Sequence, residues 1–538
     1  MSNATATMPT AEAASKPRLD QKAHPAQGII FLGLLAVGLI FTVYSLYSDV
    51  STAGAPTRTI LPFILLGIAL LVALGFEFVN GFHDTANAVA TVIYTHSLPP
   101  HFAVIWSGLF NFLGVLTSTG AVAFGILSLL PVELILQVGS DAGFAMVFAL
   151  LIAAIIWNIG TWALGLPASS SHTLIGSIIG VGLANQLMAS AGSATSGVDW
   201  NQALNVGRTL LISPLVGFIC SALLFLAMKA AIRAPQLYTA PKGDQPPPFW
   251  IRGLLVLTCT GVSFAHGSND GQKGMGLIML ILIGTVPTAY ALNRAMPEDQ
   301  VTHFHAVAQA TEQSLTPYAN NVAAPADFRE GVAAYVRNHA LQPETIPALI
   351  KLIDANAAQV AQYGSITRVP TEVVDNVRND MYLTSEAIRL MQKAGSPAFD
   401  ADTTKNLGAY KKDLDSATKF IPTWVKVAVA IALGLGTMIG WRRIVVTVGE
   451  KIGKSHMTYG QGGAAELVAM GTIFAADWYG LPVSTTHVLS SGVAGTMAAN
   501  KSGLQWSTVR NLAMAWVLTL PVAILLSGTL YFIFRHVF

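Results

Sequence analysis

Two short segments repeat the same run of hydroxyl residues after a proline. Residues 165–176 read GLPASSSHTLIG and residues 480–491 read GLPVSTTHVLSS, 315 positions apart. Proline breaks a helix, so a new helix is expected to begin at the hydroxyls, where free backbone N–H groups and partial positive charge attract anions. We therefore predict a site for a small tetrahedral oxyanion. Its candidate residues are Ser169, Ser170, Ser171, Ser484, Thr485 and Thr486, with Pro167 and Pro482 at the breaks.

A second, looser pair of segments places a carboxylate at corresponding positions. FVNGFHDTANA begins at residue 78 and FAHGSNDGQKG at residue 264, which aligns Asp84 with Asp270. An isolated charge in an apolar stretch costs about 2.5–3.5 kcal/mol on insertion scales, so the pair indicates cation or proton handling. A structural partnership with a buried cation is the alternative. Amide oxygens that could bind a cation come from Asn80, Asn87 and Asn269. Glu77 supplies a carboxylate for proton relay.

Lys273 breaks the correspondence between the two copies, because it aligns with Asn87. An ammonium group beside Asp270 can take the place of a bound sodium ion, or it can pair with an anionic substrate. Either use would make one half of the site independent of sodium. A structural ion pair without consequence for transport is the alternative.

Four histidines accompany these motifs. His172 and His487 follow the first serine of each hydroxyl run by three residues, and we expect them to brace the hydroxyls by hydrogen bonds. His83 and His266 do not align with each other, and we expect a supporting role for both. Because no spacing typical of a closed zinc site is present, no metal ligands are assigned to the protein itself.

The composition is that of an integral membrane protein. Of 538 residues, 53% are hydrophobic and only 11% are charged, with a mean hydropathy of +0.55, whereas a soluble domain is about 25% charged. The formal net charge is +2 and no basic block suggests nucleic acid. We therefore expect a multi-pass membrane protein that does not bind nucleic acid.

Apolar stretches of about 20 residues, the length that spans a bilayer, recur in two similar series. In each series polar residues interrupt a long stretch, 60–94 at 77–87 and 251–292 at 266–273, which predicts a broken helix. The predicted fold is all-α, with two inverted-topology repeats, broken helices and re-entrant helical hairpins. The predicted parts are a polar tail 1–27, an extra transmembrane helix 28–47, repeat 1 at 60–232, a cytoplasmic linker 233–250, the start of repeat 2 at 251–293, an insertion 294–420 and the rest of repeat 2 at 421–538.

The insertion 294–420 has a different composition from the rest of the chain. It holds 15 of the 28 acidic residues in under a quarter of the length, together with 12 Lys and Arg. Such a composition belongs in water, so we predict a soluble helical segment.

Basic residues suggest how the chain is oriented. They concentrate in the N-terminal tail, in the joint 229–252 and in the loop 441–456, which the positive-inside rule places in the cytoplasm. These three segments lie on the same side only if each interrupted stretch crosses the membrane an odd number of times. The helices around each GLP segment must then return to the side on which they started. The repeats are then inverted, and the insertion and C-terminus lie outside.

These motifs resemble the inorganic phosphate transporter (Pit) family, in particular its bacterial low-affinity, proton-coupled branch. The resemblance rests on NGFHDTANAVATVIYT from residue 80, AHGSNDGQKG from residue 265, GTMIGWRR from residue 436 and both GLP segments. It implies symport of phosphate with a cation and, in the bacterial branch, uptake of a neutral divalent-metal–phosphate complex with protons. Sodium-coupled relatives tend to have Asn at the positions of His83 and Lys273, which puts sodium coupling in doubt.

The resulting prediction is an inner-membrane phosphate symporter that works by alternating access and is not an enzyme. Serines and threonines of the two hydroxyl runs, with Lys273, are predicted to bind phosphate. Asp84, Asn87, Asn269, Asp270 and Glu77 are predicted to handle the coupling proton or ion. No cofactor is expected, but Mg, Ca, Zn, Mn or Co can travel with the phosphate.

Several further expectations and alternatives accompany this prediction. Arsenate is expected to compete with phosphate, lipid surrounds the chain, and a homo-oligomer is compatible with it. A sodium-coupled phosphate symporter and a transporter of sulfate or another oxyanion stay open. So does a membrane enzyme or receptor whose function lies in the soluble segment.

Overall fold

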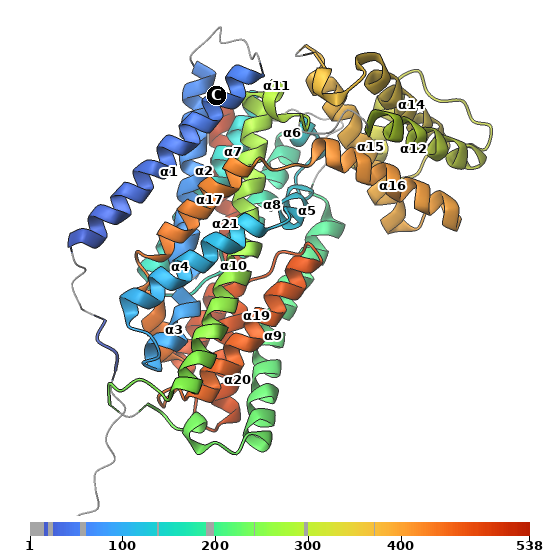
Figure 1. Cartoon of the computed structure of the whole chain (residues 1–538). Coiled ribbons are helices and arrows are strands. Elements are labelled where there is room, and N and C mark those ends of the chain that lie inside the picture. Colours follow the sequence, from blue (N-terminus) through green and yellow to red (C-terminus); the bar gives the residue numbers. More distant parts are fainter. Residues whose placement is uncertain are drawn as a thin grey trace, which may run out of the picture.

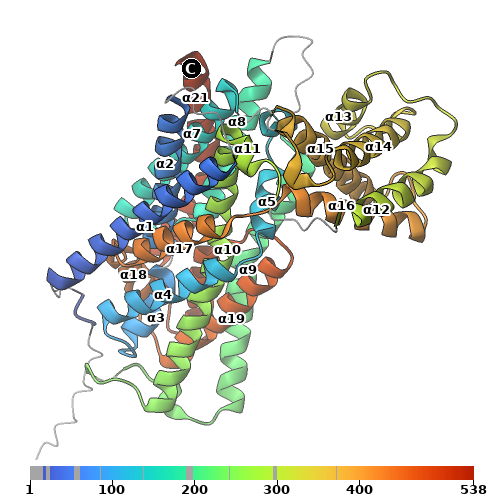
Figure 2. The ribbon, with the colours of Figure 1, turned by 45° about the horizontal axis from the view of Figure 1, so that its top comes forward.

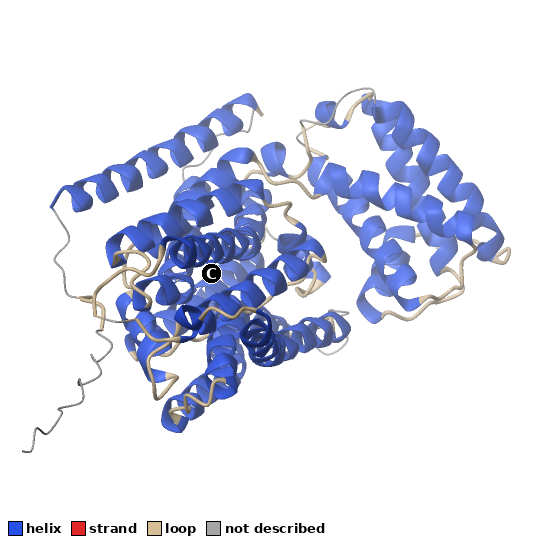
Figure 3. Ribbon diagram, turned by 60° about the horizontal axis from the view of Figure 1, so that its bottom comes forward, coloured by secondary structure: helices blue, strands red, loops and turns tan. Residues whose placement is uncertain are grey.

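The computed structural model describes residues 16–19, 25–53, 61–84, 86–136, 139–189, 198–241, 243–294, 300–370 and 372–537. These residues form helices and connecting loops, without a β-strand (Figure 3). Most of the predicted tail 1–27 lies outside the described residues. The extra helix predicted at 28–47 is present and longer, as α1 (Pro25–Thr52) on the outside of the helical body (Figure 1).

The first half of the membrane part contains eight further helices in the described residues. They are α2 (Leu61–Asp84), α3 (Ala86–Tyr94), α4 (Pro100–Thr117), α5 (Ala121–Leu127), α6 (Val132–Leu136), α7 (Asp141–Ala163), α8 (Ser170–Met188) and α9 (Trp200–Ala231). A short 3-10 helix, η1 (Pro235–Tyr238), lies in the joint to the second half. The apolar stretch at 102–127 is divided between α4 and α5 at Gly120, whose φ is 90°.

The second half begins before the insertion and resumes after it. Its elements are α10 (Phe249–Thr285), α11 (Pro287–Tyr290), α17 (Thr423–Thr437), α18 (Arg442–Val446), the π-helical turn η4 (Thr447–Lys451), α19 (Tyr459–Trp478), α20 (Thr485–Ala499) and α21 (Trp506–Val537). Local signals fix several helix starts in both halves. For example, Thr458 and Gln461 form a capping box at α19, which satisfies two backbone N–H groups.

One helix differs from the prediction. The second interrupted stretch is not broken at 266–273, because α10 runs continuously from Phe249 to Thr285. Its polar side chains bond along the helix: His266 Nε2 lies 3.3 Å from Asp270 Oδ2, and Lys273 Nζ lies 2.5 Å from Asp270 Oδ1. This helix contains no proline, and its charged side chains pair with partners one turn away. Both features stabilise a continuous helix. The helix ends at Thr285, so that Val286, the residue before Pro287, is not helical, as is usual before a proline.

Seven spans in the described residues are long and apolar enough to cross a membrane. They are Pro25–Thr52, Phe63–Tyr94, Pro100–Thr117, Asp141–Ala163, Trp200–Ala231, Phe249–Thr285 and Trp506–Val537. A bent pair, α16 (Ala401–Thr418) with α17, could add an eighth. The chain is therefore an all-helical protein with several membrane-capable helices.

The two halves are interlocked rather than placed side by side. Helix α8 of the first half packs along α21, the last helix of the second, and α20 of the second half packs along α9, the last helix of the first. Both of these last helices are 32 residues long and contain an internal proline, Pro214 in α9 and Pro521 in α21.

The basic segments gather at one end of the molecule. Lys16 pairs with Glu450 at 2.6 Å, and Arg18 lies 3.8 Å from Asp244, so the described part of the tail touches both the loop 441–456 and the joint. Figure 1 shows the joint between α9 and α10 at the opposite end from the C-terminus and the insertion. The three basic segments therefore lie at one end of the molecule, as expected from their charges. That this end faces the cytoplasm stays a prediction.

The insertion forms a small helical bundle beside the membrane part (Figures 1 and 2). Its elements are α12 (Gln300–Leu315), η2 (Thr316–Ala319), α13 (Phe328–Asn338), α14 (Thr345–Tyr363), η3 (Ile366–Arg368), α15 (Val374–Ala394) and α16 (Ala401–Thr418). Arg378 donates to the Ile135 carbonyl at 3.3 Å, and Arg389 lies 3.7 Å from Asp199. The insertion is thus held against α6 and the start of α9.

Close helix packing makes one glycine of α2 sensitive to substitution. A Cβ on Gly81 would lie 3.0 Å from Gly436 Cα and closer still to the Leu433 carbonyl. We expect Gly81→Ala to lower the free energy of unfolding by about 1–3 kcal/mol, seen as a lower thermal unfolding midpoint in detergent. Gly67→Ala on the same helix is the control, since a Cβ there meets nothing within 4 Å. Equal midpoints for the two variants would contradict the packing.

Candidate functional site

Each GLP segment ends one helix and begins another, as predicted. Gly165 and Gly480 have φ of 66° and 64° and follow α7 and α19. Ser169 caps α8, because its Oγ accepts from the His172 backbone N–H at 3.2 Å, and Ser484 caps α20 in the same way. The hydroxyl residues therefore lie at two helix N-termini, which carry partial positive charge.

The two helix starts meet in the interior. Ser171 Oγ donates to the Val483 carbonyl at 2.9 Å, and the rings of His172 and His487 pack with centroids 4.5 Å apart. The imidazoles do not brace the hydroxyls: His172 Nδ1 and His487 Nε2 form no hydrogen bond with a described residue. That expectation was wrong, because the capping bonds use the backbone N–H groups of these histidines and leave the rings free to stack.

Asp84, at the end of α2, joins the two helix starts. Its carboxylate accepts hydrogen bonds from Ser170 Oγ of α8 and, at 2.8 Å, from Thr486 Oγ1 of α20. His83 Nδ1 lies 2.8 Å from the same carboxylate. Asn87 donates to Thr486 at 3.1 Å. Predicted substrate-binding and coupling residues are therefore in direct contact.

Asp270 forms the other half of this centre. It is fully buried and is paired with Lys273 at 2.5 Å. The Lys273 ammonium also donates to Ser171 Oγ at the start of α8. Lys273 thus links the carboxylate of one half to the hydroxyl run of the other.

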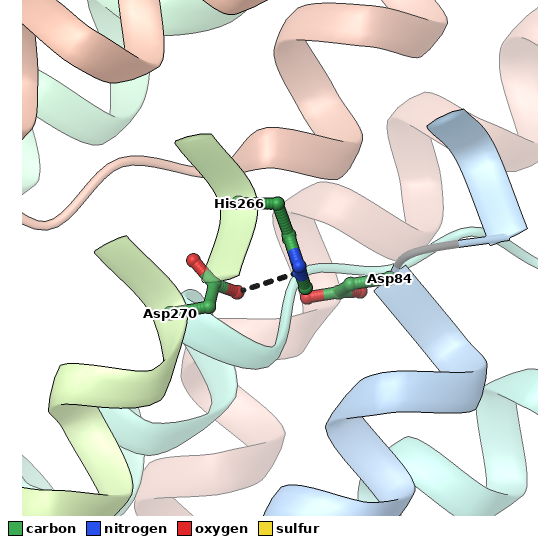
Figure 4. A group of neighbouring side chains, drawn as sticks. All are labelled: Asp84, His266 and Asp270. Atoms are coloured by element: carbon green, nitrogen blue, oxygen red, sulfur yellow. Dashed lines mark ion pairs between the residues drawn. The ribbon is translucent and has the colours of Figure 1, made fainter. Parts of the chain in front are cut away.

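Asp84, His266 and Asp270 come together across α2 and α10 (Figure 4). One potential ligand atom from each lies within 4.8 Å of the others, and all three side chains are buried. Carboxylate and imidazole groups suit a divalent cation. From the sequence alone, only a supporting role is expected for His266, and no metal ligands are expected in the protein itself. The four-residue spacing of His266 and Asp270 on one helix face could have signalled the pair, but the approach of Asp84 depends on tertiary packing.

The remaining predicted residues surround this centre. Asn80 accepts from Ser170 at 2.8 Å, and Asn269 donates to the Leu481 carbonyl at 3.1 Å. The Glu77 carboxyl is fully buried against Gly274, where an added Cβ would lie 2.6 Å from the Glu77 Cδ. Thr485 Oγ1 forms no hydrogen bond with a described residue. Every predicted site residue thus belongs to one buried region.

Long apolar helices around a buried cluster of charges and hydroxyls define the class: an integral membrane transporter. The model of the phosphate transporter family, PHO4, matches residues 80–527. The chain is 42% identical over 497 residues to "Low-affinity inorganic phosphate transporter PitA" of Escherichia coli K12, covering 87% of this chain and 96% of that protein. PitB of the same organism is 42% identical over 488 residues, with the same coverage.

A more distant relative is the "Low-affinity inorganic phosphate transporter" of Buchnera aphidicola from Acyrthosiphon pisum. It is 39% identical over 494 residues, covering 87% of this chain and 96% of that protein. A solved structure, "The sodium-dependent phosphate transporter", covers 88% of this chain and 100% of its own with a TM-score of 0.49 at 17% identity. The chain belongs to the phosphate transporter family, and it is a transporter rather than an enzyme.

Proposed function

We propose that this chain is a low-affinity symporter in the inner membrane that imports inorganic phosphate together with protons. The observation that carries the coupling is Lys273, whose ammonium is bonded to both Asp270 and Ser171. A fixed cation at this point neutralises the carboxylate without bound sodium, and it offers a positive charge to a phosphate that displaces Ser171. The family membership supports phosphate as the substrate.

The hydroxyl runs and helix N-termini are suited to hold the phosphate. Ser170, Ser171 and Thr486 are engaged with protein groups in this conformation. Phosphate therefore has to exchange these bonds for its own, which would free Asp84 from two hydroxyls. This exchange links substrate binding to the charge state of Asp84, as symport requires.

Glu77 is a second candidate proton site besides Asp84, and the candidate site for a divalent metal includes Asp84. A charged Glu77 in a fully buried place would be costly, so its carboxyl is suited to bind and release a proton. Asp84, His266 and Asp270 are suited to hold a metal that travels with the phosphate. Movement of the two helix starts against the remaining helices, within two inverted repeats, would expose the centre to each side in turn.

Uptake of labelled phosphate into proteoliposomes tests this function. We expect uptake to require an inward proton gradient and Mg²⁺, to ignore sodium, and to be inhibited by arsenate but not by sulfate. A requirement for sodium would keep the substrate and reject the coupling. Inhibition by sulfate as strong as that by arsenate would instead indicate a general oxyanion transporter. Uptake that survives removal of 294–420 would count against a function located in the soluble segment.

A further inference from the structure

A large cavity lies between the insertion and the membrane part. Its volume is about 980 Å³, and its walls come from α5, α9, α15, α16 and the second GLP segment. Figures 1 and 2 both show α5 between the membrane helices and α16. The cavity therefore lies at the end of the transporter that carries the insertion.

The walls of this cavity are predominantly basic. Two carboxylates, Glu386 and Asp415, face it together with a larger set of cations. The cations are Arg389, Lys393, Lys411, Lys412 and Lys419. All of them come from α15, α16 and the residue that follows α16, so the insertion supplies the charge and the membrane part supplies uncharged residues.

The two carboxylates hold three of the cations in place. Arg389 pairs with Glu386 at 2.6 Å, and Lys411 and Lys419 pair with Asp415 at 2.5 and 2.9 Å. Burial opposes ionisation of Glu386, but Lys419 and Arg389 lower the pKa of its carboxyl below the usual value. Lys419 and Lys411 likewise lower the pKa of the Asp415 carboxyl against the effect of its burial, so both carboxylates remain ionised at neutral pH and hold these three side chains in place.

Two lysines of the cavity wall have no carboxylate partner in an ion pair among the described residues and can bind an anion. Lys393 donates to Gln202 of α9 at 3.2 Å. Neither Lys393 nor Lys412 forms an ion pair with a carboxylate of the described residues, and both side chains belong to exposed residues at the cavity wall. The lining residues thus carry more cations than carboxylates, and Asp199 beside the cavity, 3.7 Å from Arg389, offsets only part of this excess.

The cavity ends next to the transport centre. Leu481 of the second GLP segment lines it, and the Leu481 carbonyl accepts from Asn269, the residue before Asp270. Gly125 of α5, which also lines the cavity, lies against the same segment, because a Cβ on it would be 3.0 Å from the Gly480 carbonyl. A small anion in the cavity is therefore separated from the centre by the GLP segment that has to move during transport.

We propose that the insertion makes this cavity an anion-collecting vestibule, where inorganic phosphate is held before it passes the second GLP segment. The inference rests on the proposed phosphate uptake and adds a first binding site to it. Clefts lined by charge of one sign raise association rates by about 10–10³-fold. An anionic lipid headgroup also carries a phosphate group. The cavity, however, extends from the insertion to the second GLP segment, so we favour free inorganic phosphate as its occupant.

The test removes the two unpaired charges and follows initial rates of labelled phosphate uptake by intact cells that lack their own phosphate transporters. For Lys393→Gln/Lys412→Gln we expect kcat/KM to fall at least about 3-fold at about 10 mM ionic strength, with the maximal rate unchanged. The difference should vanish at about 300 mM, where charges are screened beyond a few ångströms. Lys351→Gln/Lys405→Gln is the matched control, because both lysines are exposed on the insertion and neither lines this cavity.

The outcomes separate this inference from the function on which it rests. Absence of uptake by the parent chain would reject phosphate transport and the vestibule with it. Normal parent uptake with identical kinetics in both double variants would reject the vestibule alone. In proteoliposomes, a loss that appears with phosphatidylglycerol but not with phosphatidylcholine alone would assign the lysines to lipid and also overturn the inference.

Discussion

Asp84→Asn is expected to lower phosphate uptake by at least about 10-fold while the protein stays folded. The Asp84 carboxylate accepts from both helix starts, through Ser170 and Thr486, and lies beside His83. A hydrogen bond to a charged group contributes roughly 1.5–3 kcal/mol, and about 1.4 kcal/mol corresponds to a factor of ten. Asparagine keeps the shape, but it can neither hold the negative charge nor take up a proton.

The measurement is labelled phosphate uptake, together with the elution volume and thermal unfolding midpoint of the purified variant. Asp141→Asn is a matched control, because Asp141 is an exposed residue in the first turn of α7 and should leave uptake unchanged. An Asp84→Asn variant that transports within about 2-fold of the parent would show that the carboxylate charge is not part of the mechanism.

Lys273→Asn is expected to convert uptake from sodium-independent to sodium-stimulated. The substitution gives the second copy the residue that the first copy has at Asn87. It also leaves Asp270 buried without its 2.5 Å partner, and breaking a buried ion pair costs about 3–5 kcal/mol. A small cation that enters beside Asp270 would recover part of this free energy. Uptake without sodium should therefore fall at least about 10-fold, and sodium should restore part of it.

Two readouts check this outcome independently of each other. One is uptake with and without sodium, and the other is the thermal unfolding midpoint, which sodium should raise in the variant but not in the parent. Lys426→Asn controls for the loss of a lysine from a membrane-part helix, since Lys426 of α17 donates only to the Ser118 carbonyl among the described residues. A folded Lys273→Asn variant that ignores sodium in both measurements would refute the proposed role of Lys273.

Features encoded within a few residues were predictable from the sequence. Proline followed by hydroxyls fixes where α8 and α20 begin, and the three-residue spacing from Lys273 to Asp270 places both groups on one helix face. The duplication added a reason to expect the two hydroxyl runs near each other. The charge-rich composition of 294–420 marked it as a segment distinct from the membrane helices, and the predicted helices are present there; its solubility stays a prediction.

Features that depend on packing between distant segments were not predictable in the same way. The polar residues at 266–273 suggested a break in α10. A helix breaks only where its backbone bonds are lost or replaced, and here the polar side chains pair along the helix. The stacking of His172 on His487 and the approach of Asp84 to His266 require the two halves to be docked. Which charges of the insertion pair with one another is likewise a property of the folded bundle.

The crossed packing of α8 with α21 and of α20 with α9 also governs how the chain can mature. During synthesis α8 leaves the ribosome more than 300 residues before α21 does, so its buried face waits for a partner until the end of translation. Neither half can be completed alone. Truncation in the last helix should therefore leave the N-terminal half unfinished and expose it to membrane proteases, however far the lost residues lie from the substrate.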